Sequence, residues 1–485
     1  MTVQPPIQRL STGVAGLDAI LLGGFIPQRG YLVRGGPGSG KTTLGLHFLA
    51  AGTRAGERCL YISLEEPEER IRANAALCGL DLADVGVLDI SPSADDFTQG
   101  QRYDLFAPGA VEREPMTRRI IAQIEATRPQ RVFLDPMTQF RYLTADAFEY
   151  RRQVVSLLRY LVERGATVLY SSEKNASLPD DDLQFMADGV IDIDSGPHGR
   201  AISVTKLRGS DFRAGPHTLK LVAAGAVVFP RLEPIPQPAD FDYETLSSGL
   251  RAVDTLMSGG IERGTVNLIT GPTGVGKTTL GLQFMCAAAE RGDYAVIYAF
   301  EEEAAMLLRR SDGIGLPARS LLARERLNIR KIEPLQYTPD EFAALVIEDV
   351  DRRGARIVMI DGVTGYNLSL RGDDLQARMH ALCKYLQNRG VAVILLNEQE
   401  VIVGDFRATE MGLSYLADSI LFLRYLEMGG ELRRAIGVLK KRLSDFEKTL
   451  REFRISQHGI EVGEPLIHMS GILRGSPQQI PAQGH

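Results

Sequence analysis

Two short segments of the chain have residue types and a spacing that bind nucleotide phosphates. Residues 35–42 read GGPGSGKT and residues 271–278 read GPTGVGKT, so both satisfy the pattern G-x-x-x-x-G-K-[ST]. Glycines let backbone N–H groups wrap around phosphate oxygens, and the start of a following helix adds positive charge. We therefore expect Lys41 and Lys277 to reach the β- and γ-phosphates of ATP. The residues expected to hold the nucleotide are Gly35, Gly36, Pro37, Gly38, Ser39, Gly40, Lys41, Thr42 and Thr43, and Gly271, Pro272, Thr273, Gly274, Val275, Gly276, Lys277, Thr278 and Thr279.

An aspartate closes an apolar segment downstream of each phosphate-binding loop (P-loop). Asp135 ends RVFLD and Asp361 ends RIVMID. A carboxylate at the carboxyl end of a parallel strand faces the crevice where ligands bind, and there it can hold Mg²⁺ directly or through water. A helix N-cap is the alternative role for such an aspartate. The expected metal ligands are Thr42, Asp135, Thr278 and Asp361.

A pair of glutamates follows another apolar segment in each half of the chain. The pairs are Glu65 with Glu66, and Glu301 with Glu302. Hydrolysis of a nucleotide needs a group that orients or deprotonates the attacking water, and a carboxylate beside the γ-phosphate suits that role. We expect one glutamate of each pair to face the site; a solvated acidic turn is the alternative.

Cations recur near the end of each half, far in sequence from the P-loops. They are Lys206 and Arg208, and Lys440 and Arg442. They could reach back to the nucleotide of their own half or reach a phosphate held by the next subunit, where an arginine finger stabilises transition-state charge. An exposed basic strand end is the third alternative.

The order of these motifs indicates a duplicated domain. Lys41 and Lys277 lie 236 residues apart (277 − 41), and the other motifs recur at nearly the same offset. Apolar runs at 59–66, 131–136 and 166–173 predict strands, and helical spacing follows the first P-loop, with Gly52 expected to stop that helix. Strands alternating with helices predict an α/β fold: two tandem P-loop domains, each with a mainly parallel sheet flanked by helices. The expected boundaries are 1–232 for the first domain, 233–242 for a proline-rich linker, and 243–485 for the second domain with a short tail.

Composition agrees with a globular protein in a reducing cytoplasm. The chain has 485 residues, a net charge of −6, and four scattered cysteines without a CxxC spacing. The longest apolar runs have strand length, so we expect no membrane segment. The acidic balance gives no global attraction to nucleic acid, so nucleic acid is not an expected partner.

The motifs together resemble the KaiC family, the clock ATPases and autokinases among RecA-like ATPases. The resemblance rests on the two P-loops, the paired glutamates, KLRGS at 206–210 and SGILRGSPQ at 470–478. It implies a two-tiered homohexamer that binds ATP and Mg²⁺ between subunits, with the four cations acting on the neighbour's nucleotide. It also implies ATP hydrolysis in the first domain, serine/threonine autophosphorylation in the second, and signalling partners such as a KaiB-like protein.

The chain departs from this family at the phosphorylation site and at its end. Ser414 keeps the position of the family's acceptor serine, but Tyr415 stands where the family has threonine. A tyrosine hydroxyl lies farther from the backbone, so Ser414 is the expected phosphoacceptor. The tail of eight residues after Pro477 argues against KaiA-type activation. The alternatives are a RecA- or DnaB-like nucleic-acid motor and a nucleotide-sensing scaffold without turnover.

Overall fold

The computed structural model divides the chain into two compact units, residues 1–231 and 232–485, each described here by itself. The structure describes residues 8–91, 108–141, 147–174, 180–234, 241–399, 415–428, 430–467, 469–470 and 478–479. The division falls after Arg231, and Leu232 already packs against the core of the second unit. No helix in the described part of the chain is long and apolar enough to cross a membrane.

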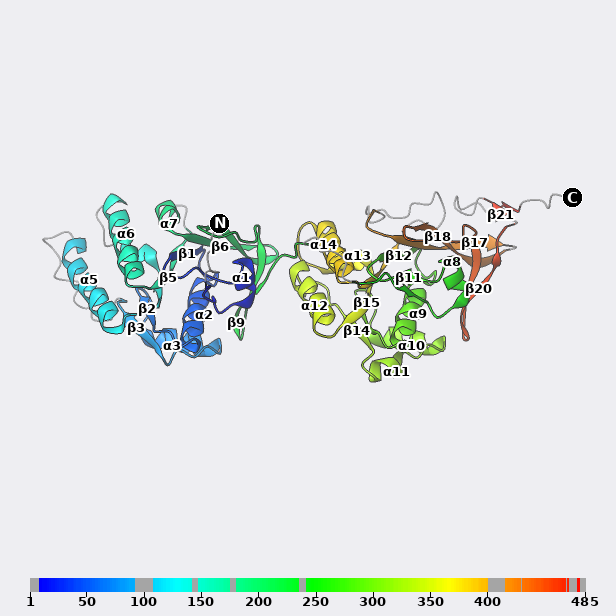
Figure 1. The fold of residues 1–485 in the computed structure, drawn as a ribbon, viewed down its shortest axis with the longest axis horizontal. Coiled ribbons are helices and arrows are strands. Elements are labelled where there is room, and N and C mark those ends of the chain that lie inside the picture. The colour runs from blue at the N-terminus through cyan, green and yellow to red at the C-terminus, as the bar shows by residue number, and fades with distance from the viewer. Residues whose placement is uncertain are drawn as a thin grey trace. The chain divides into compact units, whose positions relative to one another are not determined.

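The first unit alternates strands and helices and then ends in an antiparallel extension (Figure 1). Its helices are α1 (Ala15–Ile20), α2 (Lys41–Arg54), α3 (Glu68–Leu77), α5 (Pro108–Thr127), α6 (Ala147–Glu163) and α7 (Asp181–Met186), with a 3₁₀ turn over Met137–Arg141. Its strands are β1 (Gly30–Gly35), β2 (Cys59–Ser63), β3 (Val85–Asp89), β4 (Arg131–Asp135), β5 (Thr167–Glu173), β6 (Gly189–Gly196), β7 (Gly199–Leu207), β8 (His217–Val222) and β9 (Gly225–Phe229).

These nine strands form one sheet in the order β3-β2-β4-β5-β1-β6-β7-β8-β9. Strands β3 to β6 pair in parallel, and β6 to β9 pair antiparallel. Both faces of the parallel part are covered, because alternate residues of each strand belong to different hydrophobic clusters. Tyr31 and Val33 of β1 pack with Phe48 of α2, whereas Leu32 packs with Ile124 of α5.

The second unit repeats this arrangement with its own elements. Its helices are α8 (Arg251–Leu256), α9 (Lys277–Glu290), α10 (Ala304–Gly313), α11 (Ala318–Ala323), α12 (Pro339–Asp351), α13 (Val363–Ser369) and α14 (Leu375–Asn388). Its strands are β10 (Thr245–Leu246), β11 (Ile261–Glu262), β12 (Val266–Gly271), β13 (Tyr294–Ala299), β14 (Leu327–Lys331), β15 (Ala355–Asp361), β16 (Ala392–Glu398), β17 (Ser419–Met428), β18 (Glu431–Lys441), β19 (Arg451–Ser456), β20 (Gly459–Pro465), β21 (Met469–Ser470) and β22 (Gln478–Gln479).

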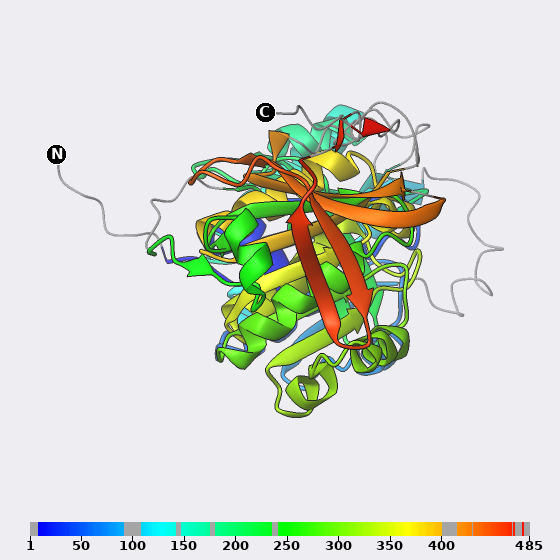
Figure 2. The same ribbon diagram turned by 90° about the vertical axis from the view of Figure 1, so that its right-hand side faces the viewer.

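The main sheet of the second unit has the order β14-β13-β15-β16-β12-β17-β18-β19-β20, which matches the first sheet strand for strand. The prediction of two RecA-like α/β domains is therefore confirmed. Figure 2 shows the antiparallel hairpin β19–β20 in red. This hairpin packs on the start of α9, because a Cβ atom at Gly276 would lie 2.6 Å from the side chain of Ile455.

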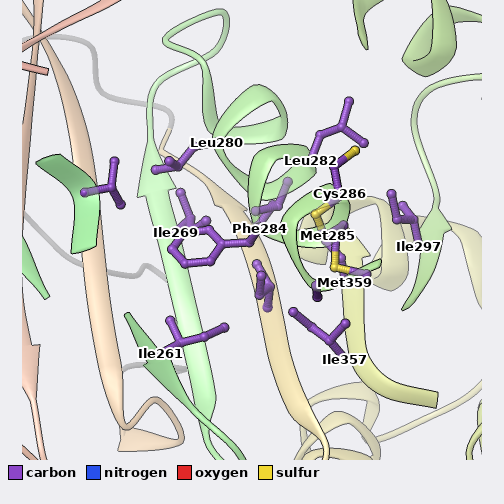
Figure 3. Close-up of a cluster of buried hydrophobic side chains, with 14 of the residues drawn as sticks. Ile261, Ile269, Leu280, Leu282, Phe284, Met285, Cys286, Ile297, Ile357 and Met359 are labelled. Carbon is purple, nitrogen blue, oxygen red and sulfur yellow. The ribbon is translucent and has the colours of Figure 1, made fainter. Parts of the chain in front are cut away.

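The helix that follows each P-loop is buried on the sheet. In the second unit, α9 places Leu280, Phe284 and Met285 against strands β12, β13 and β15, as Figure 3 shows. In the first unit, α2 continues to Arg54, so the prediction that Gly52 stops this helix is wrong. Gly52 instead allows close packing, because a Cβ atom there would lie 2.5 Å from the sulfur of Cys59.

Candidate nucleotide-binding sites

The first P-loop connects β1 to α2 in the conformation that its glycines allow. Gly38 and Gly40 have φ angles of 66° and 110°, which side-chain-bearing residues rarely adopt. The ammonium group of Lys41 folds back and donates hydrogen bonds of 2.9 Å to the carbonyl oxygens of Gly35 and Gly36. Burial lowers the pKa of Lys41, and nearby carboxylates, Asp135 first among them, oppose that shift.

The second P-loop repeats this geometry between β12 and α9. Gly274 and Gly276 have φ angles of 73° and 115°, and Lys277 donates bonds of 2.9 Å to the carbonyl oxygens of Gly271 and Pro272. Burial lowers the pKa of Lys277 as well, against the opposing charge of Glu398. The helix N-terminus and the lysine of each unit thus concentrate positive charge at the carboxyl edge of its sheet.

Each predicted metal-binding aspartate lies beside the threonine of its own P-loop. The Thr42 hydroxyl donates to Asp135 over 2.7 Å, and the Thr278 hydroxyl donates to Asp361 over 3.4 Å. Asp361 is only 7% exposed. Burial raises its pKa to about 7, and the charges of Glu302 and Glu301 add to that shift.

The glutamate pairs approach the same edge of each sheet. In the first unit, the charge of Glu65 acts on Lys41, whereas Glu66 bonds the Asn74 amide at 3.4 Å. Glu65 is therefore the member of the pair whose charge acts on the phosphate-binding lysine, and Glu66 contacts α3.

In the second unit, the charge of Glu301 acts on Lys277, whereas Glu302 forms an ion pair of 2.7 Å with Arg310. Burial raises the pKa of Glu301, and the charge of Glu398 raises it further. A carboxyl group with a raised pKa beside the phosphate site is well suited to accept a proton from water.

One carboxylate in each site was not predicted from the sequence. Glu173 ends β5 opposite Gly35, and Glu398 ends β16 opposite Gly271. Glu173 acts electrostatically on Lys41, and Glu398 accepts a hydrogen bond from the P-loop hydroxyl of Thr273. The sequence signal that could have identified Glu173 and Glu398 is an acidic residue at the end of an apolar strand, which also identified Asp135 and Asp361.

The four cations lie at the opposite edge of the sheet from the P-loop of their own unit. The backbone N–H of Arg208 donates to the carbonyl oxygen of Asp188. The backbone N–H of Asp188 in turn donates to the carbonyl oxygen of Gly30, the first residue of β1. Five residues of strand separate Gly30 from Gly35, or about 16 Å, which is farther than a lysine or arginine side chain reaches. Lys206 instead donates to the carbonyl oxygens of Gln184 and Phe185, at 2.8 and 3.1 Å.

The second unit separates its cations from its P-loop in the same way. The backbone N–H of Arg442 donates to the carbonyl oxygen of Asp418. The backbone N–H of Asp418 in turn donates to the carbonyl oxygen of Val266, the first residue of β12. Lys440 donates to the carbonyl oxygen of Ala417 at 2.6 Å, and the Arg442 guanidinium lies 3.2 Å from the Asp418 carboxylate. Within each unit, the cations therefore cannot serve the nucleotide site of that unit.

The predicted phosphoacceptor Ser414 lies outside the residues that the structure describes. Its neighbour Tyr415 is described and is 57% exposed. The Tyr415 ring lies 5.5 Å from that of His380, and its carbonyl oxygen accepts a bond of 3.1 Å from Arg442. The position after Ser414 therefore belongs to the edge of the sheet that carries the cations.

Comparison with known proteins agrees with this geometry. The sequence model of the ATPase family KaiC matches residues 10–233 and 246–467. The chain belongs to the KaiC family. It is 26% identical to the circadian clock protein KaiC3 of Synechocystis sp., over 97% of this chain and 95% of that protein. It is 28% identical to the circadian clock oscillator proteins KaiC of Prochlorococcus marinus and Synechococcus elongatus, over 98% of this chain and 96% and 92% of theirs.

This KaiC-like chain is thus an ATP-binding protein of an ATPase family, and its residues fit a magnesium ion beside the nucleotide. The Oδ2 atom of Asp361 is buried without a hydrogen-bond partner among the described residues. A bound ion can satisfy such a buried carboxylate oxygen. The described residues contain no group of three or more His, Cys, Asp or Glu side chains that could hold a metal by themselves.

The raised pKa of Asp361 predicts a pH-dependent stability. Between about pH 4 and pH 7 the folded state keeps a proton that the unfolded state has lost, so stability falls as pH rises through this window and stays low above it. In metal-free protein at pH 8, Asp361→Asn should therefore increase the free energy of unfolding of the second unit by about 1–4 kcal/mol. Denaturant unfolding in EDTA at pH 5 and pH 8 measures this change, and the gain should shrink at pH 5.

Asp135→Asn is the matched control, because Asp135 has hydroxyl partners on both carboxylate oxygens and should gain no stability when its charge is removed. An equal gain for Asp361→Asn at both pH values would contradict the prediction.

Proposed function

We propose that the protein hydrolyses Mg-ATP at sites completed by a neighbouring subunit in a two-tiered homohexameric ring. The observation that carries this proposal is the separation of P-loop and cations to opposite edges of each sheet. A ring in which the cation edge of one subunit meets the P-loop edge of the next brings both halves of the site together. Heterologous contacts of this head-to-tail kind generate closed rings when the rotation between subunits closes.

The chain's own residues have distinct tasks in this reaction. The P-loop amides and Lys41 or Lys277 bind the phosphates, and Thr42 with Asp135, or Thr278 with Asp361, would hold Mg²⁺. When bound, the ion neutralises charge on the phosphate oxygens. Glu65 or Glu301 orients the attacking water and accepts its proton, and the neighbour's cations stabilise the charge that develops on the transferring phosphoryl group.

The glutamate pairs should be essential for turnover but not for binding. In a Lys277→Ala background, replacing Glu65 and Glu66 by Gln should lower phosphate release from the first site by about 10²–10⁴-fold, because the proton acceptor is lost. Affinity for a fluorescent ATP analogue should remain. Glu69→Gln is the control, since it removes a glutamate charge from an exposed position of α3. Turnover of the double variant at the parent rate would remove the glutamates from the mechanism.

The division of the second site between subunits has a direct test by mixing. In protein whose first site is silenced by Glu65→Gln and Glu66→Gln, neither Lys277→Ala nor the double variant Lys440→Ala/Arg442→Ala should hydrolyse ATP alone. Rings assembled from equal amounts of both should recover about a quarter of the parent turnover, because random mixing pairs an intact P-loop with intact cations at that fraction of interfaces. If mixing restored no turnover while rings assembled, the action of the cations between subunits would be refuted.

We propose further that the second unit phosphorylates Ser414, by its resemblance to the acceptor serine of the family. Phosphopeptide mapping after incubation with Mg-ATP should find phosphate on Ser414, with none in Ser414→Ala and an undiminished level in Tyr415→Phe. The tyrosine hydroxyl projects several ångströms farther from the backbone, and errors near 1 Å already cost about 10²-fold in rate. Phosphate on Tyr415 alone would contradict this geometric argument.

A further inference from the structure

The aspartate of the first site has hydroxyl partners that the second site lacks. Oδ2 of Asp135 accepts hydrogen bonds from Thr42 at 2.7 Å and from Tyr61 at 3.0 Å, and Oδ1 accepts one from Ser171. Asp361 accepts only the bond of 3.4 Å from Thr278 among the hydrogen bonds of the described residues, and its Oδ2 has no partner there.

Strand register explains this difference between the two sites. Ser63 pairs with Asp135 in the first sheet and Ala299 pairs with Asp361 in the second, so Tyr61 and Ile297 are equivalent positions. Tyr170 pairs with Leu134 and Leu395 pairs with Ile360, so Ser171 and Leu396 are also equivalent. Figure 3 shows Ile297 among the buried hydrophobic side chains of the second unit.

We propose that Tyr61 and Ser171 are positioning residues, which hold the Asp135 carboxylate in the orientation that receives magnesium in the first site only. This inference rests on the proposed function. Two hydroxyl donors on different oxygens restrict rotation of the carboxylate about its Cβ–Cγ bond. Groups that bond a metal ligand in this way typically contribute 10–100-fold to metal affinity.

The hydroxyls are not required to build the sheet. The second unit forms the same strand order and the same pairing with Ile297 and Leu396 at these positions, and all four side chains are buried. Burying a hydroxyl is unfavourable unless it is hydrogen-bonded. Tyr61 and Ser171 both donate their hydroxyl hydrogens to Asp135. We therefore infer that their role is to orient this carboxylate.

The second site holds its aspartate differently. The negative charges of Glu302 and Glu301 act on Asp361, which has no second hydroxyl donor among the described residues. The first unit thus offers magnesium an oriented carboxylate, whereas Asp361 of the second unit accepts one long hydrogen bond, from Thr278, among the described residues.

Magnesium titration of the first site tests the proposal. The parent protein carries Lys277→Ala, so that only the first P-loop binds a fluorescent, non-hydrolysable ATP analogue, and the variants add Tyr61→Phe or Ser171→Ala. Each variant should lower the Mg²⁺ affinity of the nucleotide complex by about 10–100-fold. Nucleotide affinity in EDTA should change by less than about twofold, because neither hydroxyl touches the P-loop lysine.

Tyr170→Phe is the matched control, since it removes the hydroxyl of another buried tyrosine one residue from Ser171. That hydroxyl bonds the carbonyl oxygen of Leu183, so Mg²⁺ affinity should stay at the parent value. Unchanged Mg²⁺ affinity in both test variants, or an equal loss of nucleotide affinity in EDTA, would overturn the proposal. If the parent protein bound no nucleotide with or without Mg²⁺, the proposed function itself would fail instead.

Discussion

Everything at the two nucleotide sites depends on the parallel pairing around β1 and β12. Because parallel strands end at the same edge of a sheet, the P-loop, the aspartate and the glutamates of each unit meet although they come from distant parts of the chain. The antiparallel pairs β6–β7 and β17–β18 then bring the chain back to the opposite edge, where Arg208 and Arg442 bond the backbone of Asp188 and Asp418. One arrangement of strands therefore both assembles the acidic half of each site and withholds the basic half from it.

The duplication preserved backbone geometry more strictly than side-chain chemistry. Both P-loop lysines donate to the first two carbonyl oxygens of their loops at 2.9 Å. In each loop, the glycine directly before the lysine has a positive φ angle. The side chains around the aspartates differ, with Tyr61 and Ser171 in one unit and Ile297 and Leu396 in the other. A sheet tolerates such exchanges, because hydroxyl and aliphatic side chains can both fill a buried position if the hydroxyl finds an acceptor.

The sequence was sufficient for the features that follow from local pattern. Lys41, Thr42 and Asp135 could be placed at one candidate site because a P-loop and a strand-ending carboxylate are short motifs, and the repeat predicted two domains of one fold. Which glutamate of each pair faces the lysine, and which neighbours surround Asp135, depend on sheet register, which joins residues far apart in the chain. Gly52 was misread because a glycine that stops a helix and a glycine that admits a neighbour look alike in sequence.

The cation edge has a consequence for how nucleotide and subunits influence each other. If a phosphate binds the P-loop of one copy and the arginine of another, nucleotide affinity and subunit affinity are two expressions of one coupling free energy. Dilution then weakens ATP binding, and ATP binding strengthens the association of subunits. The concentration of the chain then affects its activity, because Arg208 and Arg442 lie out of reach of the P-loop of their own unit.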